Sequence, residues 1–329
     1  MSELQIESIE NYGLSKKAKP KVLFSKVGIV GCGTVGQSIA LMIASKGIEI
    51  AFIELKDDLI QLAYNGIERE LNAQIDHWGM TENEKKIILS RIKGFTHYGC
   101  LKDCDLVIES ILSKSRELSV DIRKGVFINV EKNVSPHTII ATNSTTLVIT
   151  ELSSELQYKN RCVSLHFLTN SPDSRIVEVV RGLYTSDEVY ENVCKFTRLI
   201  GKRMIPVEES PGLLSVRLFV SIINEACEIL MEGVGKMDDI DLTMKDGLGL
   251  SLGPFEMSDK VGLDKVLRWM DNLYQEFGDI KYKASPLIKR LVRANQLGRK
   301  TGKGFYFYDE EGKKIAPKNN FESPCNQNN

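Results

Sequence analysis

The sequence predicts an α/β fold that combines a doubly wound sheet, a helical hairpin inserted between two of its strands, and an all-α C-terminal domain. Three observations indicate this fold. Short β-branched apolar runs alternate with helical stretches from residue 26 to about residue 201. Two helical stretches follow one another after the second run, and strand-like runs largely disappear after Ser210-Pro211-Gly212. Alternating strands and helices are typical of a parallel sheet with both faces covered.

Each predicted element has its own signal. The strand runs have the length of buried strands, and most are bounded by Gly, Asp, Asn or Pro; they span residues 27–30, 50–53, 106–108, 138–141, 162–165 and 176–180. Residues 57–78 and 81–92 show helical periodicity on either side of Gly79, and Thr81 with Glu84 forms a capping box. We therefore predict an N-terminal extension (1–25), a sheet domain (26–209), an all-α domain (210–312) and a flexible tail (313–329).

Composition excludes several classes of protein. The chain of 329 residues is 42% hydrophobic and 26% charged, which is a globular balance of a size typical of two domains. Its formal net charge of -1 gives no global attraction to nucleic acid or to an anionic membrane. The seven cysteines are scattered without CxxC pairing, so we expect no disulfide framework and no metal site. Without an apolar run of about 18 residues or a signal peptide, we expect a cytoplasmic protein.

A glycine-rich turn joins the first predicted strand to a helix over residues 37–46, and it reads Gly31-Cys32-Gly33-Thr34-Val35-Gly36. Gly31 permits the tight turn, Gly33 lets the backbone approach a pyrophosphate, and Gly36 lets the helix pack closely on the strand. The helix N-terminus offers unpaired N–H groups to the phosphates. Glu54 ends the second strand, where a carboxylate holds a ribose diol and repels a 2′-phosphate. The pattern predicts a Rossmann-type domain that binds NAD in preference to NADP.

A histidine and a glutamate form the candidate catalytic pair. His166 follows a predicted strand, and open α/β sheets bind ligands at the carboxyl ends of their strands. Histidine suits the removal of a hydroxyl proton while hydride leaves carbon, because its ordinary pKa lies near working pH. Glu178 lies on the next predicted strand, where it is placed to hold the second ring nitrogen. The other histidines (His77, His97 and His137) have no such setting and are interpreted as surface or packing residues.

Further motifs follow in a fixed order, namely Ala141-Thr142-Asn143-Ser144-Thr145-Thr146-Leu147, His166-Phe167 with residues 176–180, Ser210-Pro211-Gly212, Gly253-Pro254-Phe255-Glu256-Met257, Gly262-Leu263-Asp264 and residues 297–305. With these motifs the chain resembles the 3-hydroxyacyl-CoA dehydrogenases of the short 3-hydroxybutyryl-CoA type over roughly residues 26–310. The resemblance implies NAD-dependent oxidation of a 3-hydroxyacyl thioester, or the reverse reaction, by His166 and Glu178. It also implies a homodimer formed through the C-terminal domain.

The resemblance assigns roles to Thr145 and Lys300, and position along the chain adds Asn143 and Glu109. Thr145 aligns with a hydroxyl that binds the substrate oxygen, and Asn143 shapes the same loop. Lys300 aligns with a lysine near the cofactor. Glu109 ends a strand, and we expect it to line the cofactor pocket.

Departures from the family gather around the substrate. Thr169-Asn170 stands where the family has Asn-Pro, and Val216 stands where an Asn contacts the substrate. Ser113 and Leu118 replace a Glu and a Lys that help to hold the cofactor.

The end of the first hairpin helix departs most. The family has a lysine cluster there that suits the phosphates of coenzyme A, whereas residues 73–78 hold Asp76 and no lysine. Losing Lys–phosphate hydrogen bonds forfeits about 1.5–3 kcal/mol for each one. An acyl carrier protein is therefore an alternative carrier to CoA. Five basic residues offer it a docking face, unless they form a solvated helix face: Arg69, Lys85, Lys86, Arg91 and Lys93.

Two other functions stay open. One is a dehydrogenase of a free hydroxy acid or sugar acid on the same scaffold. The other is a non-catalytic NAD-binding protein, which the presence of both His166 and Glu178 disfavours.

Overall fold

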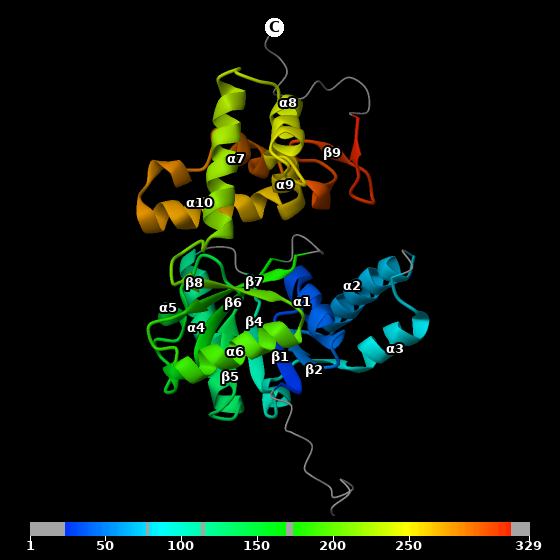
Figure 1. Cartoon of the computed structure of the whole chain (residues 1–329), viewed down its shortest axis with the longest axis vertical. Helices are drawn as coiled ribbons and strands as arrows, with labels where there is room; N and C mark the ends of the chain where they lie inside the picture. The colour runs from blue at the N-terminus through cyan, green and yellow to red at the C-terminus, as the bar shows by residue number, and fades with distance from the viewer. Residues whose placement is uncertain (1–23, 77–78, 113–115, 169–173, 317–329) are drawn as a thin grey trace, which may run out of the picture.

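The computed structural model describes residues 24–76, 79–112, 116–168 and 174–316. An eight-stranded sheet with helices around it forms one domain, and a helical domain lies beyond one end of the strands (Figure 1). The strand order is β3-β2-β1-β4-β5-β6-β7-β8. The strands are β1 (Lys26–Val30), β2 (Glu49–Ile53), β3 (Ile92–Phe95), β4 (Leu106–Glu109), β5 (Ile139–Thr142), β6 (Cys162–Phe167), β7 (Ile176–Arg181) and β8 (Arg203–Glu208). The six predicted strands and the Rossmann-type fold are confirmed.

Three features of the sheet differ from the prediction. β3 begins at Ile92, where we had expected a helix to end, and β8 was not predicted. Both are edge strands with few buried side chains, so neither carries an apolar run. β7 runs antiparallel to β6, although a parallel sheet was predicted. The connection between them is residues 168–175, which is too short for a parallel crossover of about a dozen residues or more.

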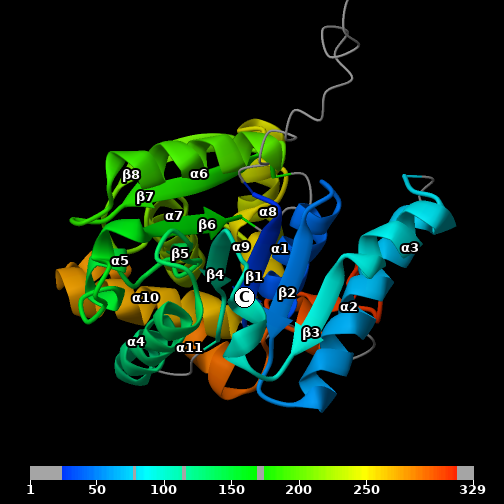
Figure 2. The ribbon, with the colours of Figure 1, turned by 90° about the horizontal axis from the view of Figure 1, so that it is seen from below.

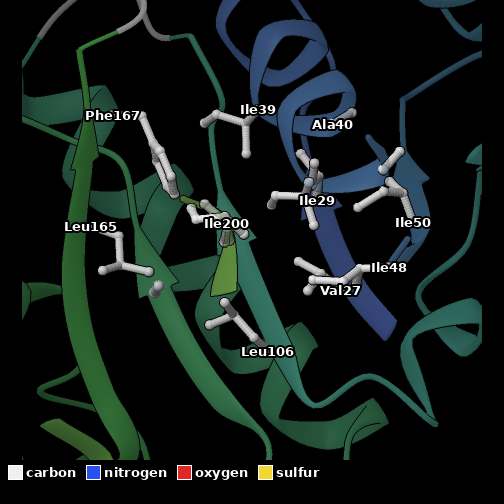
Figure 3. Packing of buried hydrophobic residues seen from close by; sticks show 14 of the residues in the cluster. Val27, Ile29, Ile39, Ala40, Ile48, Ile50, Leu106, Leu165, Phe167 and Ile200 are labelled. Atoms are coloured by element: carbon white, nitrogen blue, oxygen red, sulfur yellow. The ribbon is translucent and has the colours of Figure 1, made fainter. Parts of the chain in front are cut away.

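Helices cover both faces of the sheet (Figure 2). α1 (Thr34–Ala44), α2 (Asp57–Asp76), α3 (Glu82–Ser90) and α6 (Asp187–Leu199) contribute to one core cluster. Figure 3 shows part of this cluster, with Ile39 of α1 packed near Ile29 and Phe167. α4 (Arg116–Asn133) and α5 (Ile149–Leu152) pack on the opposite face. The predicted helical hairpin is α2 and α3, and the capping box of Thr81 and Glu84 is present.

The helical domain contains α7 (Ser215–Met231), α8 (Met237–Leu242), α9 (Pro254–Val261), α10 (Leu263–Phe277) and α11 (Pro286–Arg293), with a π-helical turn at Thr243–Gly247. Short 3-10 turns lie at Tyr98–Leu101, Lys159–Arg161, Ile280–Tyr282 and Arg299–Thr301.

The prediction of an all-α domain was incomplete. β9 (Phe307–Tyr308) pairs with β10 (Lys314–Ile315), so ordered structure extends into the segment predicted as a tail from residue 313.

A tight connection joins the two domains. Gly212 has φ 83° and Leu213 has φ 51°, and both values lie in the left-handed region that favours glycine. The amide of Gly212 donates to the Thr145 carbonyl over 2.7 Å. On the other side of the junction, Asn272 Nδ2 of α10 donates to Thr146 Oγ1 over 2.8 Å. The helical domain is thus held against the loop that follows β5.

Candidate active site

The structure brings His166 and Glu178 together. They are direct partners in the antiparallel register of β6 and β7, which places both side chains on the same face of the sheet. His166 Nδ1 lies 2.6 Å from Glu178 Oε2. His166 is 8% exposed and Glu178 is 2% exposed. A short contact between two largely buried groups holds the imidazole ring in one orientation.

The other domain also contacts Glu178. Its Oε1 accepts the amides of Ser215 over 2.9 Å and Leu214 over 3.2 Å, and its Oε2 accepts the Ser215 hydroxyl over 2.9 Å. Burial acts to raise the pKa of Glu178, but the hydrogen bonds from His166 and Ser215 outweigh it and hold the pKa below its ordinary value. The carboxylate is therefore ionised. We had not predicted Ser215, because its contact with β7 exists only once the domains have docked.

The loop after β5 supports the pair from the neighbouring strand. Asn143 Oδ1 accepts the amide of Phe167 over 2.9 Å, which fixes the backbone directly after His166. Thr145 is half-buried, and its carbonyl accepts the amide of Gly212. The Thr145 hydroxyl has no hydrogen-bond partner within the described ranges, so it is available to a ligand.

The glycine-rich turn fits a dinucleotide. Gly31 has φ +90°, and a Cβ there would meet Ile111. A Cβ on Gly36 would lie 2.2 Å from the Gly31 carbonyl oxygen. A Cβ on Gly33 would meet nothing within 4 Å, so this glycine is not required by packing. Gly33 caps α1 without a side-chain hydrogen bond, and the first turn holds no acidic residue. The turn therefore presents open space and free N–H groups, as a pyrophosphate requires.

Glu54 and Cys32 lie at the same turn. Glu54 Oε1 accepts the amide of Cys32 over 2.5 Å, which places the carboxylate beside the site where the ribose is expected. Burial, and then the charge of Glu54, raise the pKa of the Cys32 thiol to about 12. Cys32 thus contributes a backbone group rather than a reactive thiolate. Thr34 is exposed, and Val35 is partly buried against the core.

Glu109 is engaged by the protein itself. It is 2% exposed, and its carboxylate accepts the Thr142 hydroxyl over 2.6 Å and the Ile111 amide over 2.7 Å. Arg123 Nε lies 3.1 Å from the same carboxylate. These contacts brace the ends of β4 and β5. They give Glu109 a positioning role within the protein, and its expected place in the cofactor pocket stays a prediction; sequence spacing gave no sign of Arg123.

The remaining predicted positions are more dispersed. Lys300 Nζ lies 2.5 Å from Asp264 Oδ1, in the helical domain. Val216 is 2% exposed and packs in the core of that domain. Ser113, Thr169 and Asn170 lie outside the described residues, as does the side chain of Leu118.

A membrane-spanning helix and a metal site are both absent from residues 24–76, 79–112, 116–168 and 174–316. No described helix is both long and apolar enough to cross a membrane. Among these residues there is also no group of three or more His, Cys, Asp or Glu that could hold a metal ion.

Family models match both domains. The model of the 3-hydroxyacyl-CoA dehydrogenase NAD binding domain matches residues 26–210, and that of the C-terminal domain matches residues 212–308. The 3-hydroxybutyryl-CoA dehydrogenase of Clostridioides difficile is 36% identical over 285 residues, which cover 87% of this chain and 100% of that protein.

Solved structures agree with these matches. The (S)-3-hydroxybutyryl-CoA dehydrogenase PaaH1 of Ralstonia eutropha has a TM-score of 0.77 at 36% identity, over 87% of this chain and 100% of that one. FadB2 of M. tuberculosis has a TM-score of 0.83 at 29% identity, over 87% and 99% of the two chains.

Proposed function

The chain belongs to the 3-hydroxyacyl-CoA dehydrogenase family, and on this premise we propose that His166 and Glu178 carry out its proton transfer. Family membership confirms the predicted resemblance, the oxidoreductase class and NAD as the cofactor. The reaction proposed is oxidation of the 3-hydroxyl of an acyl thioester, or reduction of the matching ketone. The observation that carries the proposal is the 2.6 Å contact between the buried His166 Nδ1 and Glu178.

This contact assigns a role to each ring nitrogen. The ionised carboxylate accepts a hydrogen bond from Nδ1–H, so the proton of the neutral ring resides on Nδ1 and Nε2 keeps its lone pair. Nε2 of His166 therefore takes the proton of the 3-hydroxyl, and in the reverse direction it returns a proton to the ketone oxygen. Glu178 stabilises the imidazolium that forms. When bound, NAD supplies the hydride acceptor.

Other residues orient the reactants. The Thr145 hydroxyl is placed to donate to the substrate oxygen, as its alignment implies. The α1 N-terminus around Gly33 would hold the pyrophosphate and Glu54 the ribose diol, and Lys300 would lie near the cofactor.

Replacement of His166 tests the proton-transfer role. We expect His166→Gln to lower kcat by about 10²–10⁴-fold, the usual range for loss of a general base, while NADH binding followed by fluorescence persists. His137→Gln, on an exposed loop, is the matched control. Turnover of His166→Gln within a few-fold of wild type would disprove the role. Absence of NADH binding to the wild-type chain would support a non-enzymatic protein instead.

The thioester carrier is a separate question. The relatives are named for CoA thioesters, and we propose CoA for this chain on that ground. The hairpin, however, favours an acyl carrier protein as a second candidate. A hollow at its tip is lined by Asp76 and Glu84 and by no basic residue among those described, so a CoA phosphate would meet like charge there.

The proposed docking face is smaller than predicted. Arg91 donates to the carbonyl of Ala44 over 3.0 Å and so closes the end of α1, and Lys85 Nζ bonds Asn72 over 2.6 Å. Arg69, Lys86 and Lys93 remain exposed.

Turnover of one acyl group on three different carriers distinguishes CoA from an acyl carrier protein as the substrate carrier. We would compare CoA, an acyl carrier protein and a short pantetheine thioester by NADH absorbance. A carrier-protein preference that Lys86→Glu abolishes would support docking on the hairpin, and a clear CoA preference would rule it out. Turnover of a free hydroxy acid with none on any thioester would establish the alternative function.

We also propose a homodimer. Leu214, Leu218 and Ile222 follow one another at helical spacing around α7 and are 49%, 67% and 36% exposed. Such an apolar stripe is typical of a covered surface. The cytoplasmic location stays a prediction.

A further inference from the structure

A basic stripe on α10 faces the sheet domain. Lys265, Arg268 and Asn272 are spaced by three and four residues, so they share one face of the helix. Asn272 donates to Thr146, which shows that this face points across the domain junction. Figure 1 likewise shows α10 on the side of the helical domain that is turned toward the sheet domain. Lys265 and Arg268 therefore lie at the same domain junction as the loop that carries Thr145.

One charge on this stripe, the ammonium of Lys265, is incompletely neutralised. Within the described ranges, Lys265 Nζ has no hydrogen bond and no ion pair, and it lies 5.0 Å from the centre of the Trp269 ring. The neighbouring carboxylate, Asp264, is already held by Lys300 at 2.5 Å. Arg123 of α4 approaches from the sheet domain, and its ion-pair partner is Glu109.

Charge repulsion and burial act together on these side chains. Burial, followed by the charge of Arg268, lowers the pKa of Lys265 to about 8, against the opposing effect of Asp264. Burial and the charge of Arg123 lower the pKa of Arg268, again opposed by Asp264. A partly buried ammonium without an anion is costly, and a bound anion would remove that cost.

We propose that Lys265 and Arg268 form an anion site at the junction between the domains, which takes a carboxylate of the acyl group or a phosphate of the cofactor. The inference rests on the proposed function, which places the substrate at the loop that carries Thr145. A guanidinium and an ammonium together match either anion. The acyl source would make this chain selective for an acid-bearing acyl group, whereas its relatives are named for the uncharged 3-hydroxybutyryl group.

The first test does not depend on activity. The chain has two tryptophans, so Trp78→Phe leaves Trp269 as the sole indole reporter beneath Lys265. We would titrate this full-length protein with malonate and with inorganic pyrophosphate at constant ionic strength. The expected result is a saturable change in Trp269 emission that Lys265→Met abolishes. Lys283→Met, which removes an exposed lysine from the same domain, should keep it. No saturable change with either anion would overturn the proposal, and so would an unaltered change in Lys265→Met.

The second test identifies the source of the anion. Wild type, Lys265→Met and Arg268→Gln are compared on 3-hydroxybutyryl and 3-hydroxyglutaryl thioesters of one carrier, with NADH affinity measured alongside. A loss of about tenfold or more in kcat/KM for the glutaryl substrate alone would assign the site to the acyl carboxylate. A similar loss in NADH affinity would assign it to a cofactor phosphate. Changes within about twofold in every measurement would refute the site. Failure to turn over any thioester would count against the proposed function, while the Trp269 titration would still decide the anion site.

Discussion

Glu178→Gln is the sharpest test of the catalytic pair, because it changes one atom type and nearly preserves shape. The amide oxygen can still accept the Leu214 and Ser215 amides, which donate to Oε1 in the wild type. The amide nitrogen then faces His166 Nδ1 across 2.6 Å, where the carboxylate had accepted a hydrogen bond. Two donors cannot share that contact, so the ring keeps its proton on Nε2, and Nε2 can no longer act as a base.

The substitution should lower both the stability and the activity of the protein. Stability should fall by about 1.5–3 kcal/mol, the value of one hydrogen bond to a charged group, because the backbone contacts survive. Activity should fall much further, by about 10³–10⁴-fold, as when the carboxylate that orients a catalytic histidine becomes an amide. Steady-state NADH formation measures the second effect, and urea unfolding measures the first.

Glu209→Gln is the matched control. Glu209 also lies near the junction and accepts the Thr150 amide over 2.8 Å, but it does not touch His166. Its variant should keep kcat within about twofold of wild type. The reasoning is refuted if folded Glu178→Gln retains more than about a tenth of wild-type activity.

Four further outcomes follow from the structure. Gly33→Val should weaken NADH binding, measured by fluorescence, by about tenfold or more without lowering Tm, because its Cβ enters open space at the turn. Gly36→Ala should lower Tm, measured by calorimetry, since its Cβ would lie 2.2 Å from a carbonyl oxygen. Asp259, whose pKa burial raises to about 6 despite hydrogen bonds from Tyr306, Phe305 and Tyr308, keeps its proton in the folded state to a higher pH than in the unfolded state. The free energy of unfolding should therefore fall by about 3 kcal/mol as pH rises from about 4 to 6, and Asp259→Asn should remove this slope in urea titrations. Leu218→Glu should shift the sedimentation of the chain toward the monomer, because it places a charge on the exposed stripe of α7.

Sequence patterns predicted those parts of the site whose residues lie close together along the chain. The glycine turn lies between one strand and one helix, so spacing alone locates Gly31, Gly33 and Gly36. His166 and Glu178 end up opposed because a short connection turns β7 back along β6. That connection could have predicted the antiparallel pair, since about a dozen residues are needed for a parallel crossover.

The contacts that escaped prediction join distant parts of the chain. Ser215 reaches Glu178 across 37 positions and two domains, through a left-handed Leu213 that no propensity rule favours. Arg123 meets Glu109 from a different element. The edge strand β8 contains Pro206 and alternates exposed with partly buried residues, so its apolar signal is weak. These positions depend on tertiary packing, which a single sequence reveals poorly.

In the proposed mechanism, Glu178 makes proton transfer depend on the docking of the two domains. One carboxylate holds His166 on the sheet side and receives three hydrogen bonds from Leu214 and Ser215 at the start of α7. If the helical domain moved away, Glu178 would keep its ring contact but lose the three hydrogen bonds that fix its carboxylate. The same domain carries the Lys300–Asp264 pair and the basic stripe of α10, so the proposed ligand contacts and the proposed base depend on one arrangement of the two domains.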